Sequence, residues 1–136
     1  MKKIFISILL LSSFLVKADF VDENTAEIVA KNYLINVLNN SRYIQLELAH
    51  TEYLYDKAIF YVFDIEDDFS YSHIIIAADD RYDPIRAYIP SGRYNPETRD
   101  FPGIKWWINN AKLFYIDSIV VHQTNRKLRK WDFLIN

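Results

Sequence analysis

The chain contains no cysteine and only two glycines, Gly92 and Gly103, among its 136 residues. The lack of cysteine excludes a disulfide, a thiol nucleophile, a thiolate metal ligand and lipidation at cysteine. The lack of glycine excludes a glycine-rich loop that cradles phosphate groups. What the sequence does have is 10 Tyr, 9 Phe and 3 Trp, which is typical of a packed globular domain and not of a disordered chain.

Side-chain combinations that carry chemistry are missing too. The three histidines, His50, His73 and His122, are far apart, and none has a partner at metal-ligand spacing. The acidic run at Asp64–Asp68 lacks the glycine and the terminal glutamate of a calcium loop. No Gly-x-Ser-x-Gly motif occurs either. We therefore predict that the protein is not an enzyme and that it holds no metal and no cofactor.

The first 18 residues follow the pattern of a signal peptide. Lys2 and Lys3 precede an apolar run, Ile4–Val16, that is too short to span a bilayer. Val16-Lys17-Ala18 then fits the small-residue rule for cleavage after Ala18. The sequence thus predicts a single mature domain, residues 19–136, that is exported to the periplasm or secreted and is not inserted in the membrane after cleavage. An exported domain of this size without disulfides fits a bacterial protein.

Removal of the signal peptide makes the chain more acidic. The full sequence has a formal net charge of −2 at pH 7. Loss of Lys2, Lys3 and Lys17 leaves 13 basic residues against 18 acidic ones, a net charge near −5. This balance argues against nucleic acid as the main partner.

Apolar periodicity predicts helices at both ends of the mature chain. Asn24 and Glu27 have the spacing of a capping box, and a helix is expected from 25 to 38, ended by Asn39-Asn40-Ser41. A second helix is expected from 104 to 119. Its apolar face is formed by Ile104, Trp107, Ile108, Ala111, Tyr115 and Ile119.

Four strands are predicted between the helices. Residues 44–48 alternate in polarity, and residues 59–65, 72–78 and 85–89 are rich in β-branched and aromatic side chains. Turns are expected at 56–57, 66–68 and 90–92. The unbroken apolar run in 72–78 indicates a central strand. Because the connections are short, we predict an α+β fold: an antiparallel sheet of about four strands with the N-terminal and C-terminal helices packed on one face.

Asp79, Asp80 and Arg81 stand at the end of the most hydrophobic segment. Side chains of adjacent residues in an extended backbone point to opposite faces, so the two aspartates are poorly placed to share a proton. We predict a turn, with an ion pair to Arg81 or Arg86. The role of Thr124–Asn136, which is basic and aromatic, stays open between a tail, an edge strand and a binding arm.

A binding surface is the remaining functional possibility. Aromatic side chains lie in or beside the loops after the strands: Tyr82, Tyr88, Tyr94, Phe101 and Trp106. Aromatic residues and arginine anchor many interfaces. Trp107 belongs to the core face of the second helix, so Trp106 is expected to be half-exposed or packed against the sheet edge.

Several of these segments together resemble the propeptide domain of streptopain-type cysteine proteases and the related free-standing streptopain inhibitor (Spi) family. The matching strings, which span most of the mature chain from Ala26 to Ile119, are AEIVAKNYL, FYVFDI, HIIIAADDRYDPIRAYIPSGRY and FPGIKWWINNAKLFYIDSI. Two places depart from the family pattern. Ser72-His73 stand where the family often has Gly-Phe, and Arg86-Ala87-Tyr88 stand where it has Leu-Gly-Tyr.

The resemblance implies a function and a site. Family propeptides cover the substrate cleft of the protease and disturb its catalytic histidine, and the free-standing relatives do so as separate proteins. Since the sequence ends at Asn136 without a catalytic domain, we expect a free-standing inhibitor, monomeric when free, with a streptopain-like cysteine protease as partner. The family's contact segment corresponds to the entry of the second helix. The implied protease-binding residues are Tyr94, Asp100, Phe101, Pro102, Gly103 and Trp106.

Within that segment Phe101 is either an apolar plug for the cleft or a hydrophobic staple that holds the helix start to the core. Two other functions stay open for the whole chain. One is a folding chaperone that acts on such a protease in trans. The other is a ligand-binding or adhesion module unrelated to proteolysis.

Overall fold

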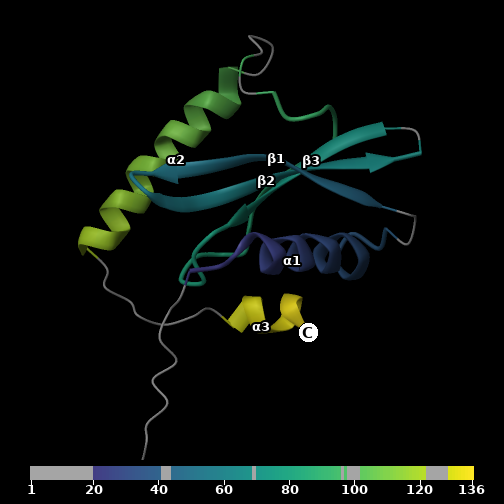
Figure 1. Ribbon diagram of the computed structural model, residues 1–136, viewed down its shortest axis with the longest axis horizontal. Coiled ribbons are helices and arrows are strands. Elements are labelled where there is room, and N and C mark those ends of the chain that lie inside the picture. The colour runs from purple at the N-terminus through teal and green to yellow at the C-terminus, as the bar shows by residue number, and fades with distance from the viewer. Residues whose placement is uncertain (1–19, 41–43, 69, 96, 98–101, 122–128) are drawn as a thin grey trace, which may run out of the picture.

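The computed structural model describes residues 20–40, 44–68, 70–95, 97, 102–121 and 129–136. The chain forms helix α1 (Glu23–Asn36), strands β1 (Gln45–Leu54), β2 (Lys57–Asp67), β3 (Ser70–Ala77) and β4 (Ile85–Ile89), and helices α2 (Pro102–Val121) and α3 (Arg129–Ile135). Figure 1 shows the sheet between α2 on one side and α1 with α3 on the other. The predicted α+β fold is confirmed.

The four strands form one antiparallel sheet in the order β1-β2-β3-β4. β3 is an interior strand, as its apolar run predicts, and six of its eight residues are buried. β1 is much longer than the predicted 44–48. It continues through polar residues to Leu54, with register shifts between Leu48 and His50 and between Glu52 and Tyr53. An edge strand tolerates polar side chains and irregular pairing because one of its sides meets no other strand.

Two of the predicted turns are displaced. The β1–β2 hairpin turns at Tyr55 and Asp56, and Tyr55 has a φ of 55°, so Lys57 already belongs to β2. Glu66 and Asp67, expected in an acidic turn, pair with β3 as the last residues of β2. The turn after β4 is where it was predicted. Gly92 adopts a φ of 83° there, a conformation that favours glycine.

Helix α1 starts earlier than the capping-box prediction. The N-cap is Asp22, whose Oδ1 accepts a hydrogen bond of 2.8 Å from the Thr25 amide. The prediction of Asn24 as the cap is therefore wrong, because an equally suitable cap residue stands two positions earlier. The buried side of the helix consists of Ala26, Val29, Ala30 and Leu34.

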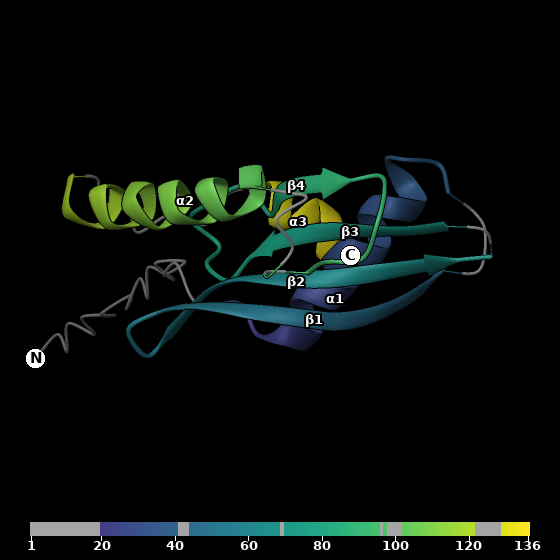
Figure 2. The same ribbon diagram turned by 90° about the horizontal axis from the view of Figure 1, so that it is seen from above.

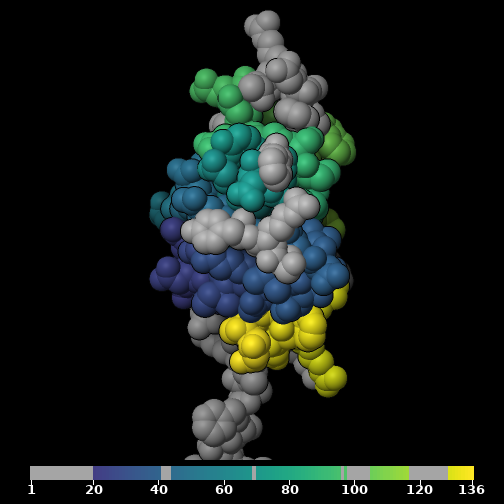
Figure 3. Space-filling view, turned by 90° about the vertical axis from the view of Figure 1, so that its right-hand side faces the viewer, coloured from purple at the N-terminus to yellow at the C-terminus, as the bar shows by residue number. Residues whose placement is uncertain are grey.

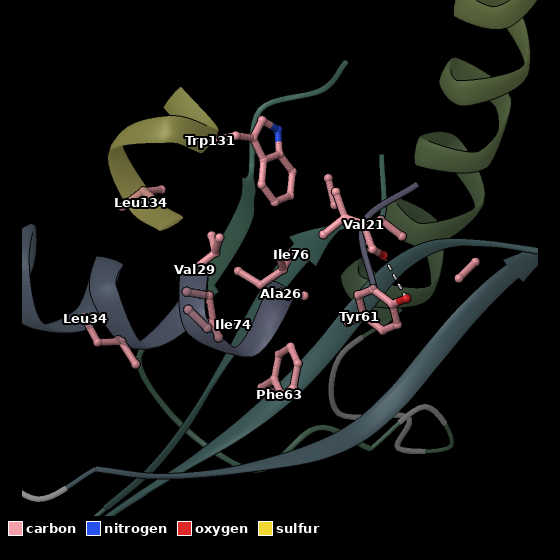
Figure 4. Close-up of a cluster of buried hydrophobic side chains, with 14 of the residues drawn as sticks. Val21, Ala26, Val29, Leu34, Tyr61, Phe63, Ile74, Ile76, Trp131 and Leu134 are labelled. Carbon is pink, nitrogen blue, oxygen red and sulfur yellow. Dashed lines mark hydrogen bonds between the residues drawn. The ribbon is translucent and has the colours of Figure 1, made fainter. Parts of the chain in front are cut away.

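The helices cover both faces of the sheet, so the prediction of helices on one face is wrong. Alternate residues of β2 point to opposite sides. Tyr61, Phe63 and Ile65 pack in a cluster with α1 and α3, whereas Phe60 and Val62 pack in a second cluster with Ile108 and Tyr115 of α2. Figure 2 shows α2 over the β4 side of the sheet, and Figure 4 shows the first cluster, with side chains from α1, α3 and the strands.

The C-terminal residues 129–135 form a helix and are not a tail, an edge strand or a free arm; residues 124–128 lie outside the described part. Trp131 is fully buried, and its Nε1 donates to the Tyr82 carbonyl at 2.7 Å. Asn32 of α1 donates to the Leu134 carbonyl at 2.6 Å. Figure 3 shows α3 directly against α1. Trp131, Leu134 and Ile135 of this segment complete the first core cluster.

Candidate functional site

Helix α2 exposes a row of large apolar side chains. Trp106 and Leu113 are 67% and 64% exposed, and Phe114 is 60% exposed. Residues seven apart lie on the same line along a helix, so Trp106 and Leu113 form the centre of this surface. Phe114 and the exposed Ile116 flank it on either side. We call these four residues the outer face of α2.

The opposite side of α2 packs on the sheet. Ile108 and Tyr115 are buried there, and Trp107 and Ala111 are partly buried against the same cluster. The Trp107 ring lies 5.8 Å from the Phe60 ring, measured between centroids. These four residues belong to the predicted apolar face, which is confirmed for them. A helix that carries large apolar side chains on both sides, of which the described residues cover one, is typical of an interaction surface.

Two polar contacts fix α2 to the sheet. The Lys112 ammonium pairs with the Glu52 carboxylate of β1, which also lies 2.9 Å from His50 Nε2. The Tyr115 hydroxyl donates to Asp79 Oδ2 at 3.2 Å. Burial, reinforced by the Asp79 charge, raises the pKa of Tyr115 to about 12. The helix is therefore held at two points, one on β1 and one in the turn after β3.

The segment before α2 is held by Tyr94. The ring of Tyr94 stacks on His50 at a centroid distance of 5.4 Å and meets His73 edge-on at 5.9 Å. Its amide donates to Asp64 Oδ1 at 2.7 Å, and its side chain is only 8% exposed. Burial raises the pKa of Tyr94 above its ordinary value. Tyr94 thus anchors the chain on the sheet just before the stretch that enters α2.

Two buried polar atoms in this cluster have no hydrogen-bond partner among the described residues. They are the Tyr94 hydroxyl and His73 Nε2. The other ring nitrogen of His73, Nδ1, lies 3.0 Å from the Gly92 carbonyl oxygen. Within the described part of the chain, no group of three or more metal-ligating side chains that could hold a metal ion is found. The cluster therefore holds Tyr94 mainly through its rings.

The turn at Asp79–Arg81 is structural, as predicted. The Asp79 carboxylate accepts from the Arg81 amide at 3.0 Å and from Arg81 Nε at 2.8 Å, and it pairs with the Arg81 guanidinium. The hydrogen bond to Asp79 raises the pKa of Arg81 above its already high ordinary value. The Tyr82 amide closes the turn by donating to the Asp79 carbonyl at 3.2 Å.

The structure separates the six predicted protease-binding residues. Asp100 and Phe101 lie outside the described residues, and Pro102 and Gly103 are the first two residues of α2. Tyr94 is buried, whereas Trp106 is exposed. Their role in binding a protease stays a prediction. Sequence analysis missed Leu113, Phe114 and Ile116, although each is an apolar residue that falls off the predicted core face of the helix.

The sequence model of the Spi protease inhibitor family matches residues 18–113. This covers most of the chain, and the protein belongs to that family. The match includes the whole sheet and the first half of α2 and ends before α3. Searches of curated proteins and of solved structures found no match. Membership of a protease inhibitor family implies a protease as partner and agrees with the prediction that the protein is not an enzyme.

No described helix is both long enough and apolar enough to cross a membrane.

Proposed function

We propose that this protein inhibits a streptopain-like cysteine protease by covering its substrate cleft, with the outer face of α2 and the segment that enters α2 as the docking surface. Membership of the Spi protease inhibitor family supports the inhibitory role. The cysteine protease as target is supported by the resemblance to streptopain propeptides. The single observation that carries the docking surface is the exposure of Trp106, Leu113 and Phe114 on a helix whose other side is packed.

The physical basis is exclusion of substrate by a rigid apolar surface. An inhibitor of this kind needs no chemistry, but it must avoid the entropic cost of becoming ordered when it binds. The contacts of Lys112 with Glu52 and of Tyr115 with Asp79 already hold α2 in place in the free protein. Tyr94 likewise holds the chain segment before α2 against the sheet, through its contacts with His50 and Asp64. We expect an interface of standard size, about 1,600 Å² in total, centred on Trp106.

Titration of residues 19–136 against proteases of different classes tests this proposal. A streptopain-type cysteine protease should lose cleavage of a peptide substrate at a stoichiometric ratio, while a serine protease and a metalloprotease keep theirs. Undiminished activity across several streptopain-type proteases would contradict the inhibitor role. In a parallel experiment the unfolded protease is refolded with and without the inhibitor. A higher refolding yield without inhibition would instead indicate a chaperone in trans.

We further propose that the protein is exported and that residues 1–18 are removed. The basic start, the apolar run and the small residue at Ala18 support this proposal. Expression of the full sequence in its host, followed by N-terminal sequencing of the exported protein, should give Asp19 as the first residue. Retention of the complete chain in the cytoplasm would contradict export.

A further inference from the structure

An open groove of about 500 Å³ lies on the face of the molecule opposite α2. Ligand sites in proteins commonly have volumes of about 300–1,000 Å³. The groove runs between α1, the start of β4 and α3. Its apolar lining comes from Tyr33, Val37, Pro84, Ile85, Phe133 and Leu134.

The apolar walls of the groove meet solvent. Val37 at the end of α1 is 51% exposed, and Phe133 of α3 is 69% exposed. Both side chains line the groove, whereas Leu134, the residue after Phe133, also lines it but is buried in the core. An occupant would therefore remove apolar surface from water without displacing the core.

Among the described residues that line the groove, one cation has no ion pair with another described residue. Lys130 pairs with Asp83 across 2.8 Å, so these two charges offset each other. Arg129 also lines the groove, is exposed, and forms no ion pair with any residue that the structure describes. A guanidinium next to apolar walls is complementary to a carboxylate attached to an apolar body.

We propose that this groove binds a linear aliphatic carboxylate, with the alkyl chain between α1 and α3 and the carboxylate on Arg129. A peptide fits less well. Each peptide unit carries an amide and a carbonyl that need partners when buried, and among the described residues of the lining only Tyr33 offers an uncharged polar side chain. The alkyl chain has no such requirement, and its one carboxylate matches Arg129, the cation of the described lining that has no ion pair with a described residue.

This site is separate from the proposed protease-binding surface. One of its walls is α3, which begins at Arg129, whereas the match to the inhibitor family ends at residue 113. The inference therefore goes beyond the proposed function and holds or fails independently of it.

Isothermal titration of residues 19–136 with dodecanoate, below its micelle concentration, tests the site. We expect saturable binding of one molecule per chain and weaker binding of decanoate. Each methylene removed should cost up to about fourfold in affinity, because a buried methylene contributes about 0.8 kcal/mol and 1.4 kcal/mol is tenfold. Dodecanol should bind at least about fivefold more weakly, since it cannot pair with Arg129.

Three variants connect the binding to the groove. Arg129→Gln should weaken dodecanoate about tenfold and leave dodecanol unchanged, and Phe133→Ser should weaken both. Lys105→Gln removes an exposed cation from α2 and should change neither. Circular dichroism melts establish that each variant is folded; because Arg129 and Phe133 are exposed, both changes should be tolerated.

Several outcomes would overturn the proposal. They are no saturable binding, equal affinity for dodecanoate and dodecanol, or equal loss in Lys105→Gln and Arg129→Gln. Binding of a peptide with an apolar C-terminus more tightly than dodecanoate would assign the groove to a protein partner. Binding to anionic phospholipid vesicles, with none to free dodecanoate, would assign it to a membrane surface.

Discussion

The Tyr115 hydroxyl of α2 donates a hydrogen bond of 3.2 Å to the Asp79 carboxylate in the turn after β3. The same carboxylate accepts from the amide and the guanidinium of Arg81. One buried acidic group therefore shapes the turn after the central strand and also anchors the helix that bears the proposed docking surface. Its two sets of contacts explain why an aspartate stands directly after the most hydrophobic segment.

Replacement of Asp79 by asparagine should destabilise the protein by about 2–3 kcal/mol. Asp79 is only 7% exposed, and the change leaves the partly buried Arg81 guanidinium without its charged partner. Chemical denaturation of Asp79→Asn and wild type gives the difference. Asp83→Asn is a matched control because its ion pair with Lys130 is exposed, and it should cost less than about 1 kcal/mol. Equal losses in the two variants would contradict the anchoring role.

Stability should fall as the pH rises from about 10 to about 12. Burial raises the pKa of both Tyr61 and Tyr115 to about 12 in the folded protein, above the ordinary value near 10. Between these values the folded state retains protons that the unfolded state has lost, so the free energy of unfolding decreases with pH. The stabilisation is complete below pH 10 and is lost on passing pH 12. Each tyrosine contributes a slope of up to about 1.4 kcal/mol per pH unit.

Denaturation at a series of alkaline pH values measures this slope. In Tyr115→Phe the contribution of one tyrosine should disappear, leaving a shallower slope, although the hydrogen bond to Asp79 is also lost at every pH. Tyr55→Phe is the control, because Tyr55 is 89% exposed and should leave the slope unchanged. A slope that is the same in all three proteins would contradict the assignment.

Much of the fold could be predicted from the sequence because the strands are strongly patterned. β4 was predicted residue for residue, and β3 was placed within two residues, since both are short apolar runs bounded by turn-forming residues. The buried side of α2 followed from helical spacing. The second half of β1 was missed, because His50, Thr51 and Glu52 give it a polar character that only the pairing with β2 offsets.

What could not be predicted depends on contacts between distant segments. The unbroken apolar run Ala58–Phe63 of β2 fits burial on both faces, but it does not show which helix covers which face, so the placement of helices on opposite sides of the sheet was missed. The role of α3 rests on Trp131 reaching the Tyr82 carbonyl, a separation of 49 residues. Tyr94 was predicted to contact the protease, and its burial between two histidines depends on β1 and β3 being brought together by β2.

The hydroxyl of Tyr94 should contribute little to stability. It is buried without a hydrogen-bond partner among the described residues, whereas the ring packs on two histidines. Tyr94→Phe should therefore change the free energy of unfolding by less than about 0.5 kcal/mol or increase it. Tyr94→Ala should cost about 2–4 kcal/mol through the lost packing. A loss of more than about 1 kcal/mol in Tyr94→Phe would show that the hydroxyl makes a hydrogen bond.

Trp131 should be essential for the stability of the whole domain. Its side chain is fully buried between α3, α1 and the sheet, so Trp131→Ala should cost about 3–5 kcal/mol in thermal or chemical denaturation. Trp131→Phe keeps part of the packing but loses the hydrogen bond to Tyr82, and its cost should be intermediate. Phe133→Ala, two residues away and 69% exposed, is the control and should cost less than about 0.5 kcal/mol. If Trp131→Ala costs no more than this control, the docking of α3 is wrong.

The outer face of α2 should determine protease affinity without contributing to stability. Trp106 and Leu113 are both largely exposed in the free protein, so Trp106→Ala and Leu113→Ala should leave the melting temperature within about 2 °C of wild type. If these side chains enter the protease interface, each truncation should raise the inhibition constant by about tenfold or more, and Trp106→Ala should have the larger effect because tryptophan is the commonest interface anchor.

The matched control for these variants is Ile28→Ala. Ile28 is 45% exposed on α1, which covers the opposite face of the sheet, so this truncation removes an exposed apolar side chain of similar size away from the proposed contact. Inhibition by Ile28→Ala should equal that of wild type. Progress curves with a fluorogenic peptide and a streptopain-type protease give the inhibition constants. If the inhibition constants of Trp106→Ala and Leu113→Ala match that of Ile28→Ala, the docking surface lies elsewhere, and a loss of inhibition confined to variants of residues 100–103 would place it at the entry of α2 alone.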